Sequence, residues 1–271
     1  MITHVPPAAF LEQTEAMGLA FDDGDLAALG AFVGHLLTAN ERMNLTRITA
    51  PDDAWIRHVF DALTLMPYFI EAAAGKAIDV GAGGGVTGIP LAICLPGVEF
   101  TLLEATGKKC DFLVQTVAAL GLKNVAVVNG RAETSAHDRE AHREMYDIVT
   151  ARAVGPLPVL LELTVPFARI GGLVLAVKGE KAPQEIEASK QALHQLHAAV
   201  AQVDRTPTGR VVVVEKLRKS PRVYPRRPGE PKRAPIGGRS AGSSPASADS
   251  PGRGPRDTTR GNPGGFSDVS P

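Results

Sequence analysis

The chain has 271 residues and a formal net charge of zero, with 44% hydrophobic and 21% charged residues. This length accommodates one sizeable α/β domain with accessory segments, and the composition excludes a chain that is disordered throughout. Neither a run of about 18 apolar residues nor a basic segment followed by an apolar one occurs, so we expect a cytoplasmic protein without membrane contact. Cys94 and Cys110 are expected to be reduced thiols.

The first 75 residues are predicted to form an N-terminal helical extension. Apolar side chains recur at helical spacing between Phe10 and Leu37, which indicates two short helices. Pro51, followed by two aspartates, marks the start of a third helix that ends near Leu65. Proline suits the first turn of a helix, and carboxylates favour its positive dipole end.

Residues 76–217 alternate between short apolar runs and stretches of helical period. The alternation predicts a Rossmann-like α/β core, in which a seven-stranded, mostly parallel sheet carries helices on both faces. The last two strands are separated by residues 205–209 alone, so we expect a hairpin that adds one antiparallel strand. The predicted strands cover 77–80, 99–103, 125–128, 146–150, 173–177, 198–203 and 211–215, and the predicted helices between them cover 89–95, 108–120, 157–168 and 183–195.

Positive charge is concentrated near the end of the sequence. Between Arg210 and Arg233 there are nine Lys or Arg residues against Glu215 and Glu230 only. A basic strip on a neutral protein indicates either an anionic partner or a solvated tail, and we treat 218–236 as a basic C-terminal segment. Residues 237–271 contain almost no aliphatic side chains and are predicted to be a disordered tail.

A glycine-rich turn follows the first predicted strand, in the run Ala77-Ile-Asp-Val-Gly-Ala-Gly-Gly-Gly-Val-Thr-Gly-Ile-Pro90. Glycines such as Gly81 and Gly83 let backbone approach a ligand closely, and the helix that follows offers free N–H groups. Glu104 closes the second predicted strand, 23 residues after Gly81, where a carboxylate can accept the hydrogens of both ribose hydroxyls. Together these features indicate a nucleoside-containing cofactor.

Asp79 helps to distinguish between the cofactors that such a turn could bind. The spacing Gly83-x-Gly85-x-x-Gly88 also satisfies the dinucleotide fingerprint. A carboxylate at Asp79, two residues before Gly81 and pointing into the loop, would repel a pyrophosphate but suits the cationic amino group and sulfonium of S-adenosylmethionine. S-adenosylmethionine therefore fits better than NAD, and a glycine turn without any ligand remains the third interpretation.

An ordered set of short motifs extends the argument from about residue 40 to residue 236. They are Asn44-Leu45-Thr46, Arg57-His58, Asp61-Ala62-Leu63, Gly88-Ile89-Pro90, Leu102-Leu103-Glu104, Gly107-Lys108-Lys109, Gly130-Arg131-Ala132-Glu133, Ala151-Arg152-Ala153, Lys178-Gly179 and Tyr224-Pro225-Arg226-Arg227-Pro228-Gly229. As a set, they resemble the bacterial 16S ribosomal RNA guanine-N7 methyltransferases, the family also known as RsmG or glucose-inhibited division protein B. The chain departs from that family at Val86, Thr87 and Ala62, where a larger apolar residue, proline and serine are usual.

The resemblance implies a class I S-adenosylmethionine-dependent methyltransferase fold and methylation of guanosine N7 in 16S rRNA of the small ribosomal subunit. It places the cofactor against Gly81, Val86, Ala132 with Glu133, and Arg152. The glycine loop and the two strands beside it add Asp79, Gly83 and Glu104. Guanine N7 has a lone pair and no proton, so positioning can supply the acceleration without a general base. Arg152, at the end of the fourth predicted strand, is the candidate for that positioning role.

Cationic side chains are the candidates for contact with RNA phosphates. They are Arg57, His58, Lys108, Lys109, Lys178, Arg222, Arg226 and Arg227. His58 fits a core histidine beside Asp61 equally well. No metal is expected, because the histidines and cysteines lack ligand spacing, and we expect a monomer. Methylation of another RNA or of a small molecule, and a non-catalytic or NAD-binding protein on the same fold, stay as alternatives.

Overall fold

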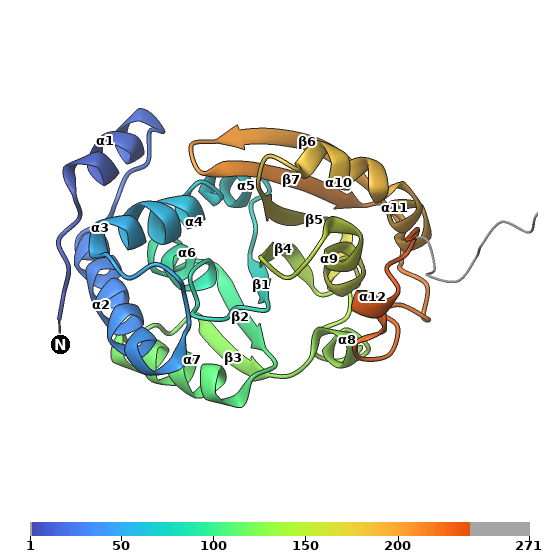
Figure 1. Ribbon diagram of the computed structural model, residues 1–271, viewed down its shortest axis with the longest axis horizontal. Coiled ribbons are helices and arrows are strands. Elements are labelled where there is room, and N and C mark those ends of the chain that lie inside the picture. The colour runs from blue at the N-terminus through green and yellow to red at the C-terminus, as the bar shows by residue number, and fades with distance from the viewer. Residues whose placement is uncertain (1, 239–271) are drawn as a thin grey trace, which may run out of the picture. The chain divides into compact units, whose positions relative to one another are not determined.

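Seven strands form one sheet, with the order β3-β2-β1-β4-β5-β7-β6, in a computed structural model that describes residues 2–238 (Figure 1). Pairing is parallel except at β7, which runs antiparallel to both β5 and β6. The predicted mostly parallel sheet with a closing hairpin is therefore confirmed. The strands are β1 (Lys76–Val80), β2 (Glu99–Glu104), β3 (Val125–Asn129), β4 (Tyr146–Arg152), β5 (Ala168–Lys178), β6 (Ala198–Thr206) and β7 (Gly209–Lys216). The tail predicted to be disordered, residues 237–271, lies outside the described residues except for Gly237 and Gly238.

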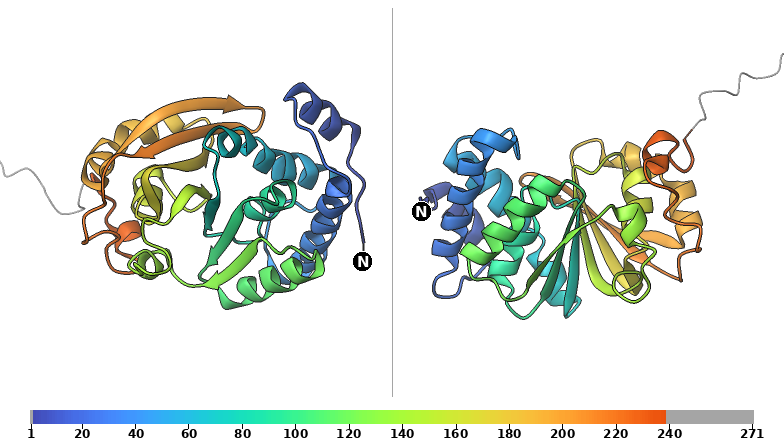
Figure 2. Two further views of the ribbon diagram at one scale, coloured as in Figure 1. Left: turned by 180° about the vertical axis from the view of Figure 1, so that it is seen from behind. Right: turned by 90° about the horizontal axis from the view of Figure 1, so that it is seen from below.

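Helices cover both faces of the sheet, and Figure 2 shows the two layers on either side of the strands. Side chains alternate between the faces along each strand, so that Ala77 packs with the N-terminal helices while Ile78 packs with the opposite layer. The first layer holds α2 (Asp25–Met43), α6 (Gly88–Cys94) and α7 (Gly107–Ala119), and the second holds α9 (Leu157–Thr164), α10 (Ala182–Ala188) and α11 (Lys190–Leu196). The prediction of helices on both faces is confirmed.

The N-terminal helices share the hydrophobic core of the first layer. The aromatic ring of Phe10 lies 4.6 Å from that of the fully buried Trp55, measured between centroids. Two details differ from the prediction: α2 has 19 residues rather than being short, and the third helix contains a π-helical turn, η1. The remaining elements of this region are α1 (Ala8–Ala16), α3 (Pro51–Ala54), η1 (Trp55–Phe60), α4 (Asp61–Leu63) and α5 (Met66–Glu71).

Several predicted boundaries in the core were wrong. The helix predicted to reach residue 168 ends at Thr164, because β5 begins at Ala168. The helix predicted over 183–195 is divided at Ser189, whose hydroxyl donates to the carbonyl oxygen of Glu185 at 2.6 Å and competes with the helical hydrogen bonds. Three short helices, α5, α8 (Ala132–Ser135) and α12 (Glu230–Arg233), were not predicted. None of the helices in residues 2–238 has the length and apolar character that crossing a bilayer requires.

Candidate cofactor and substrate cavities

The glycine loop connects β1 to α6 and is fixed to the end of β2. The N–H groups of Gly81 and Ala82 both donate to the carbonyl oxygen of Leu103, at 2.8 and 3.0 Å. Gly81, Gly83 and Gly85 have φ angles of 74°, 58° and 70°, a left-handed backbone that favours glycine. The glycines of the predicted turn thus lie in the backbone conformation that this residue type favours.

Glu104 joins this loop to the turn after β2. One carboxylate oxygen accepts from the N–H of Gly83 at 2.9 Å, and the other accepts from the N–H of Thr106 at 2.8 Å. The side chain is 7% exposed. Each oxygen of a carboxylate can accept two hydrogen bonds, so both retain one acceptor site for a further donor.

Asp79 lies beneath the loop. Its Oδ2 accepts from the N–H of Gly88, the first residue of α6, at 3.2 Å, and its Oδ1 accepts from the Thr150 hydroxyl at 2.9 Å. Burial raises the pKa of this carboxyl group to about 6, although both hydrogen bonds lower it. Asp79 contacts the end of the loop and is not among the residues that line the adjacent cavity.

A cavity of about 210 Å³ lies beside the loop, at the carboxyl ends of β1 and β2. Three predicted cofactor residues, Gly81, Ala132 and Glu133, line it. The Glu133 carboxylate accepts from the N–H of Gly229 at 2.8 Å, so the C-terminal segment closes one side. The other walls are mostly apolar and include Val80, Leu103, Val154, Val159, Leu163 and Pro231.

Arg152 ends β4 and faces a second, larger cavity of about 610 Å³. Its Nη1 lies 3.0 Å from Oδ2 of Asp61, and its Nη2 donates to the carbonyl oxygen of Arg57 at 2.7 Å. Arg57 and Lys178 line the same cavity, so three of the predicted site residues are brought together here. Lys178 is committed to Glu185, whose carboxylate is 2.8 Å from its ammonium group.

His58 is a buried residue with a partner. It is 5% exposed, and its Nε2 lies 2.8 Å from the hydroxyl of Thr46. Burial, helped by the positive charge of Arg152, lowers the pKa of His58 to about 4. The ring is therefore neutral at pH 7 and does not supply a positive charge for a phosphate.

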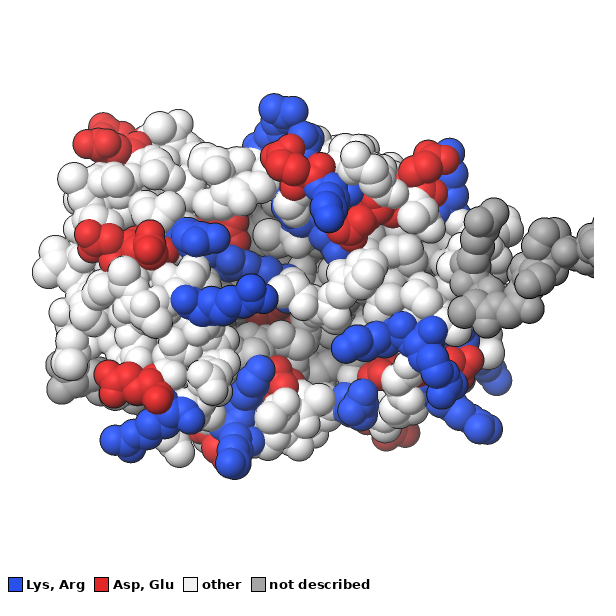
Figure 3. Space-filling view, viewed as in Figure 1, with Lys and Arg blue, Asp and Glu red and all other residues white. Residues whose placement is uncertain are grey.

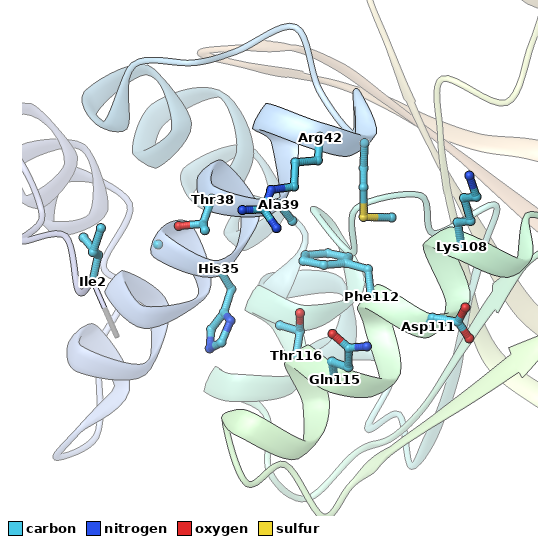
Figure 4. A pocket seen from close by; sticks show the side chains of 12 residues that line it. Ile2, His35, Thr38, Ala39, Arg42, Lys108, Asp111, Phe112, Gln115 and Thr116 are labelled. Carbon is cyan, nitrogen blue, oxygen red and sulfur yellow. The ribbon is translucent and has the colours of Figure 1, made fainter.

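The other predicted RNA-binding cations are spread over the surface, and Figure 3 shows Lys and Arg side chains around a central hollow and over α8 and α12. Lys108 lines a separate cavity of about 800 Å³ between α2 and α7, where Figure 4 shows it with Arg42. Lys109 is half-buried, while Arg222 and Arg227 are exposed. Arg226 is different, because its Nη2 is 2.6 Å from the fully buried carboxylate of Glu162.

Sequence reasoning missed part of both cavities. Asp61 was noticed only as a motif residue and as a neighbour of His58, yet its carboxylate holds Arg152 and accepts from the Thr208 hydroxyl. The motif that ends at Gly229 was interpreted as an RNA contact, although it also forms a wall of the smaller cavity. Tyr224, at the start of that motif, donates its hydroxyl to the side-chain oxygen of Gln195 at 2.5 Å.

Val86 does not line the smaller cavity, although its side chain packs against the core of the first layer. The cysteine thiols are free; Cys110 is buried, with its Sγ 3.3 Å from the carbonyl oxygen of Glu104. Within residues 2–238, no group of three or more His, Cys, Asp or Glu side chains is placed to hold a metal ion.

Solved structures of methyltransferases share this fold. An O-methyltransferase from Bacillus cereus in complex with SAH aligns with a TM-score of 0.52 and 18% identity, covering 77% of this chain and 97% of that one. A methyltransferase from Geobacter sulfurreducens aligns with a TM-score of 0.52 and 12% identity, covering 78% and 99%. The predicted class I methyltransferase fold is thereby confirmed.

Sequence relatives are much closer. Ribosomal RNA small subunit methyltransferase G from Sorangium cellulosum is 45% identical over 223 residues, which are 82% of this chain and 92% of the relative. The protein of the same name from Alkaliphilus metalliredigens is 36% identical over 228 residues, covering 82% and 95%. The family GidB, described as rRNA small subunit methyltransferase G, matches residues 25–213. The chain therefore belongs to the rRNA small subunit methyltransferase G family.

Proposed function

We propose that this protein transfers a methyl group from S-adenosylmethionine to N7 of a guanosine in 16S rRNA of the small ribosomal subunit. Membership of the rRNA small subunit methyltransferase G family carries this proposal. The two neighbouring cavities at the carboxyl ends of the parallel strands support it, because open α/β sheets bind their ligands at that edge.

The smaller cavity fits the adenosine part of the cofactor. Its apolar walls suit a purine ring, and the Glu133 carboxylate can accept from an exocyclic amino group while it holds Gly229. Glu104 has acceptor capacity left for the ribose hydroxyls, directly beside Gly83. We place the cofactor against these groups and against Gly81 and Ala132 of the cavity wall. Asp79, Val86 and Arg152 do not line this cavity, so their contact with the cofactor stays a prediction.

The bound cofactor supplies a methyl group on a positively charged sulfur. The task of the chain is to hold the acceptor base in line with that group, since guanine N7 has no proton to lose and needs no general base. The ion pair between Arg152 and Asp61, 3.0 Å long, fixes one wall of the larger cavity, two residues before Val154 of the smaller cavity. Arg152 is thus a positioning residue in this proposal.

The exposed cations serve the RNA side. Arg57, Lys108, Arg222 and Arg227 are exposed and can neutralise phosphates, and the basic segment 218–236 borders the smaller cavity through Pro231 and Lys232. We assign residues 1–75 to a helical extension and 76–217 to the catalytic core. An rRNA substrate implies that the protein works in the bacterial cytoplasm, and we propose that it acts as a monomer.

The test is transfer of labelled methyl to 30S subunits and to free 16S rRNA that lack the modification, followed by chemical cleavage at 7-methylguanosine. We expect label at one guanosine with the wild-type protein and none with Gly83→Asp, which places a carboxylate beside Glu104. Gly121→Asp is the matched control, because Gly121 also has a positive φ, of 68°, and has open space around it.

Two results would contradict the proposal. Label on a small molecule or on another RNA, with none on 16S rRNA, would support the alternative substrate classes. Binding of NAD rather than S-adenosylhomocysteine in calorimetry would remove the cofactor assignment altogether.

A further inference from the structure

The two cavities share a wall made of consecutive residues. Val154 lines the smaller cavity, while Arg152 and Ala153 line the larger one. Ala153 has a φ angle of 57°, which turns the backbone between them. A base held in the larger cavity and a cofactor held in the smaller one therefore contact adjacent residues of the same segment, 152–154.

Asp61 is the one acidic residue among those that line the larger cavity. Its side chain is 6% exposed and is held on one oxygen by Arg152. The other oxygen accepts from the hydroxyl of Thr208, in the turn between β6 and β7. An ionised carboxylate can accept about four hydrogen bonds, so these two contacts leave about two acceptor sites at a fixed position.

Guanine is the RNA base that matches such a group. Its Watson–Crick edge presents two adjacent donors, N1–H and the 2-amino group, whereas adenine and cytosine each present one amino group beside an acceptor nitrogen, and uracil presents a single N–H. A carboxylate that receives N1–H and the 2-amino group leaves N7, on the other ring, free of that contact. Pairing of a fixed carboxylate with two donors thus separates guanine from the other bases.

We propose that Asp61 accepts hydrogen bonds from N1–H and the 2-amino group of the target guanine and so selects the base that is methylated. This inference rests on the proposed function above and adds the residue that determines base specificity. Arg152 and Thr208 act through Asp61, because they hold its two oxygens in place. A purely structural Asp61, which only ties α4 to β4 and to the β6–β7 turn, predicts a different outcome below.

The experiment compares guanosine with inosine, which lacks the 2-amino group and keeps N1–H and N7. Each is placed at the modified position of 16S rRNA by ligation, and the RNA is reconstituted into 30S subunits. Loss of one hydrogen bond to a charged group predicts that kcat/KM of the wild-type protein falls roughly tenfold or more with inosine. Equal values for the two substrates would overturn the assignment of Asp61.

Asp61→Asn should remove this preference, because the variant lacks a second acceptor oxygen. We expect the kcat/KM of this variant for guanosine to equal its kcat/KM for inosine, so that the guanosine-to-inosine ratio is about one. A structural role would lower both values together and leave the wild-type ratio, which would overturn the inference. Asp147→Asn is the matched control, since Asp147 is also paired with an arginine, Arg169, but lies at the start of β4; its ratio should stay that of the wild type.

Thr208→Val provides a second variant in case Asp61→Asn does not fold, which calorimetry with S-adenosylhomocysteine would reveal. It removes the hydroxyl that holds Asp61 and leaves the carboxylate in place, so the guanosine preference should fall while S-adenosylhomocysteine binding is kept. An unchanged preference would contradict the inference. If the wild-type protein methylates no guanosine at all, the proposed function fails with it; transfer to guanosine and inosine at equal rates defeats the role of Asp61 alone.

Discussion

The buried carboxyl group of Asp79 makes folding sensitive to pH. Asp79 is 3% exposed, and burial raises its pKa from 3.8 to about 6 in the folded protein. Because the folded-state pKa lies above the unfolded value, the folded protein favours the protonated form. The preference of the folded protein for protonated Asp79 adds ~3 kcal/mol to the free energy of unfolding. This stabilisation is fully present below about pH 4 and is lost as the pH rises through about 6.

Asp79→Asn should therefore be more stable than the wild-type protein at pH 8, by up to ~3 kcal/mol, and the difference should shrink toward pH 4. The amide is neutral at every pH. Its oxygen can accept from the N–H of Gly88, and its NH₂ group can donate to the hydroxyl of Thr150. If the charge of Asp79 serves the cofactor, the same variant binds S-adenosylhomocysteine more weakly, so that stability rises while affinity falls.

The assay is urea unfolding of both proteins between pH 5 and pH 8, with calorimetry in parallel. Asp147→Asn is the control with the opposite sign. Burial alone would raise the pKa of Asp147, but hydrogen bonds from Arg169 and two backbone N–H groups outweigh it and lower the pKa. Removing that charge should destabilise the protein at pH 8. A wild-type protein that is more stable than Asp79→Asn at pH 8 would refute the reasoning.

Three further substitutions test the packing and the charges. Gly85→Ala would place a Cβ 2.5 Å from the Ile89 side chain, at a φ angle of +70°. It should lower the free energy of unfolding by roughly 2–4 kcal/mol. Gly107→Ala, whose Cβ would have nothing within 4 Å, should change the free energy of unfolding little. Arg226→Gln removes the guanidinium from the buried Glu162 carboxylate and leaves it the backbone N–H of residue 226, so it should cost roughly 3–5 kcal/mol in urea unfolding. A loss below 1 kcal/mol would show that water reaches the site. Arg227→Gln should leave stability unchanged and weaken rRNA binding, with a shallower salt dependence in filter binding, and an unchanged slope would remove Arg227 from the RNA contacts.

The sheet was predictable because its signals are local. Each strand is a short apolar run, and the left-handed backbone of the loop favours glycine at Gly81, Gly83 and Gly85. The position of Glu104 beside the loop was predictable as well, since the loop and the end of β2 are neighbours in a parallel α/β unit, while its contact with a ribose stays a prediction. These residues could be assigned without knowing how distant parts of the chain pack.

The charged contacts were not predictable, because they join residues far apart in the sequence. Arg226 looked like one member of a basic surface strip, but it pairs with Glu162, 64 residues earlier and buried in α9. His58 carried two equal interpretations until its burial and its contact with Thr46 were visible. A side chain shows its charge in the sequence, but not whether the fold has already neutralised it.

The hydrogen bond between Gly229 and Glu133 has a consequence for the order of assembly. Synthesis proceeds from the N-terminus, so the whole sheet, which ends with Lys216, is made before Gly229, Pro231 and Lys232 reach the smaller cavity. A nascent chain can thus fold its core while one wall of that cavity is still missing. Tight retention of a ligand there has to wait until this later segment has been made and has packed against Glu133.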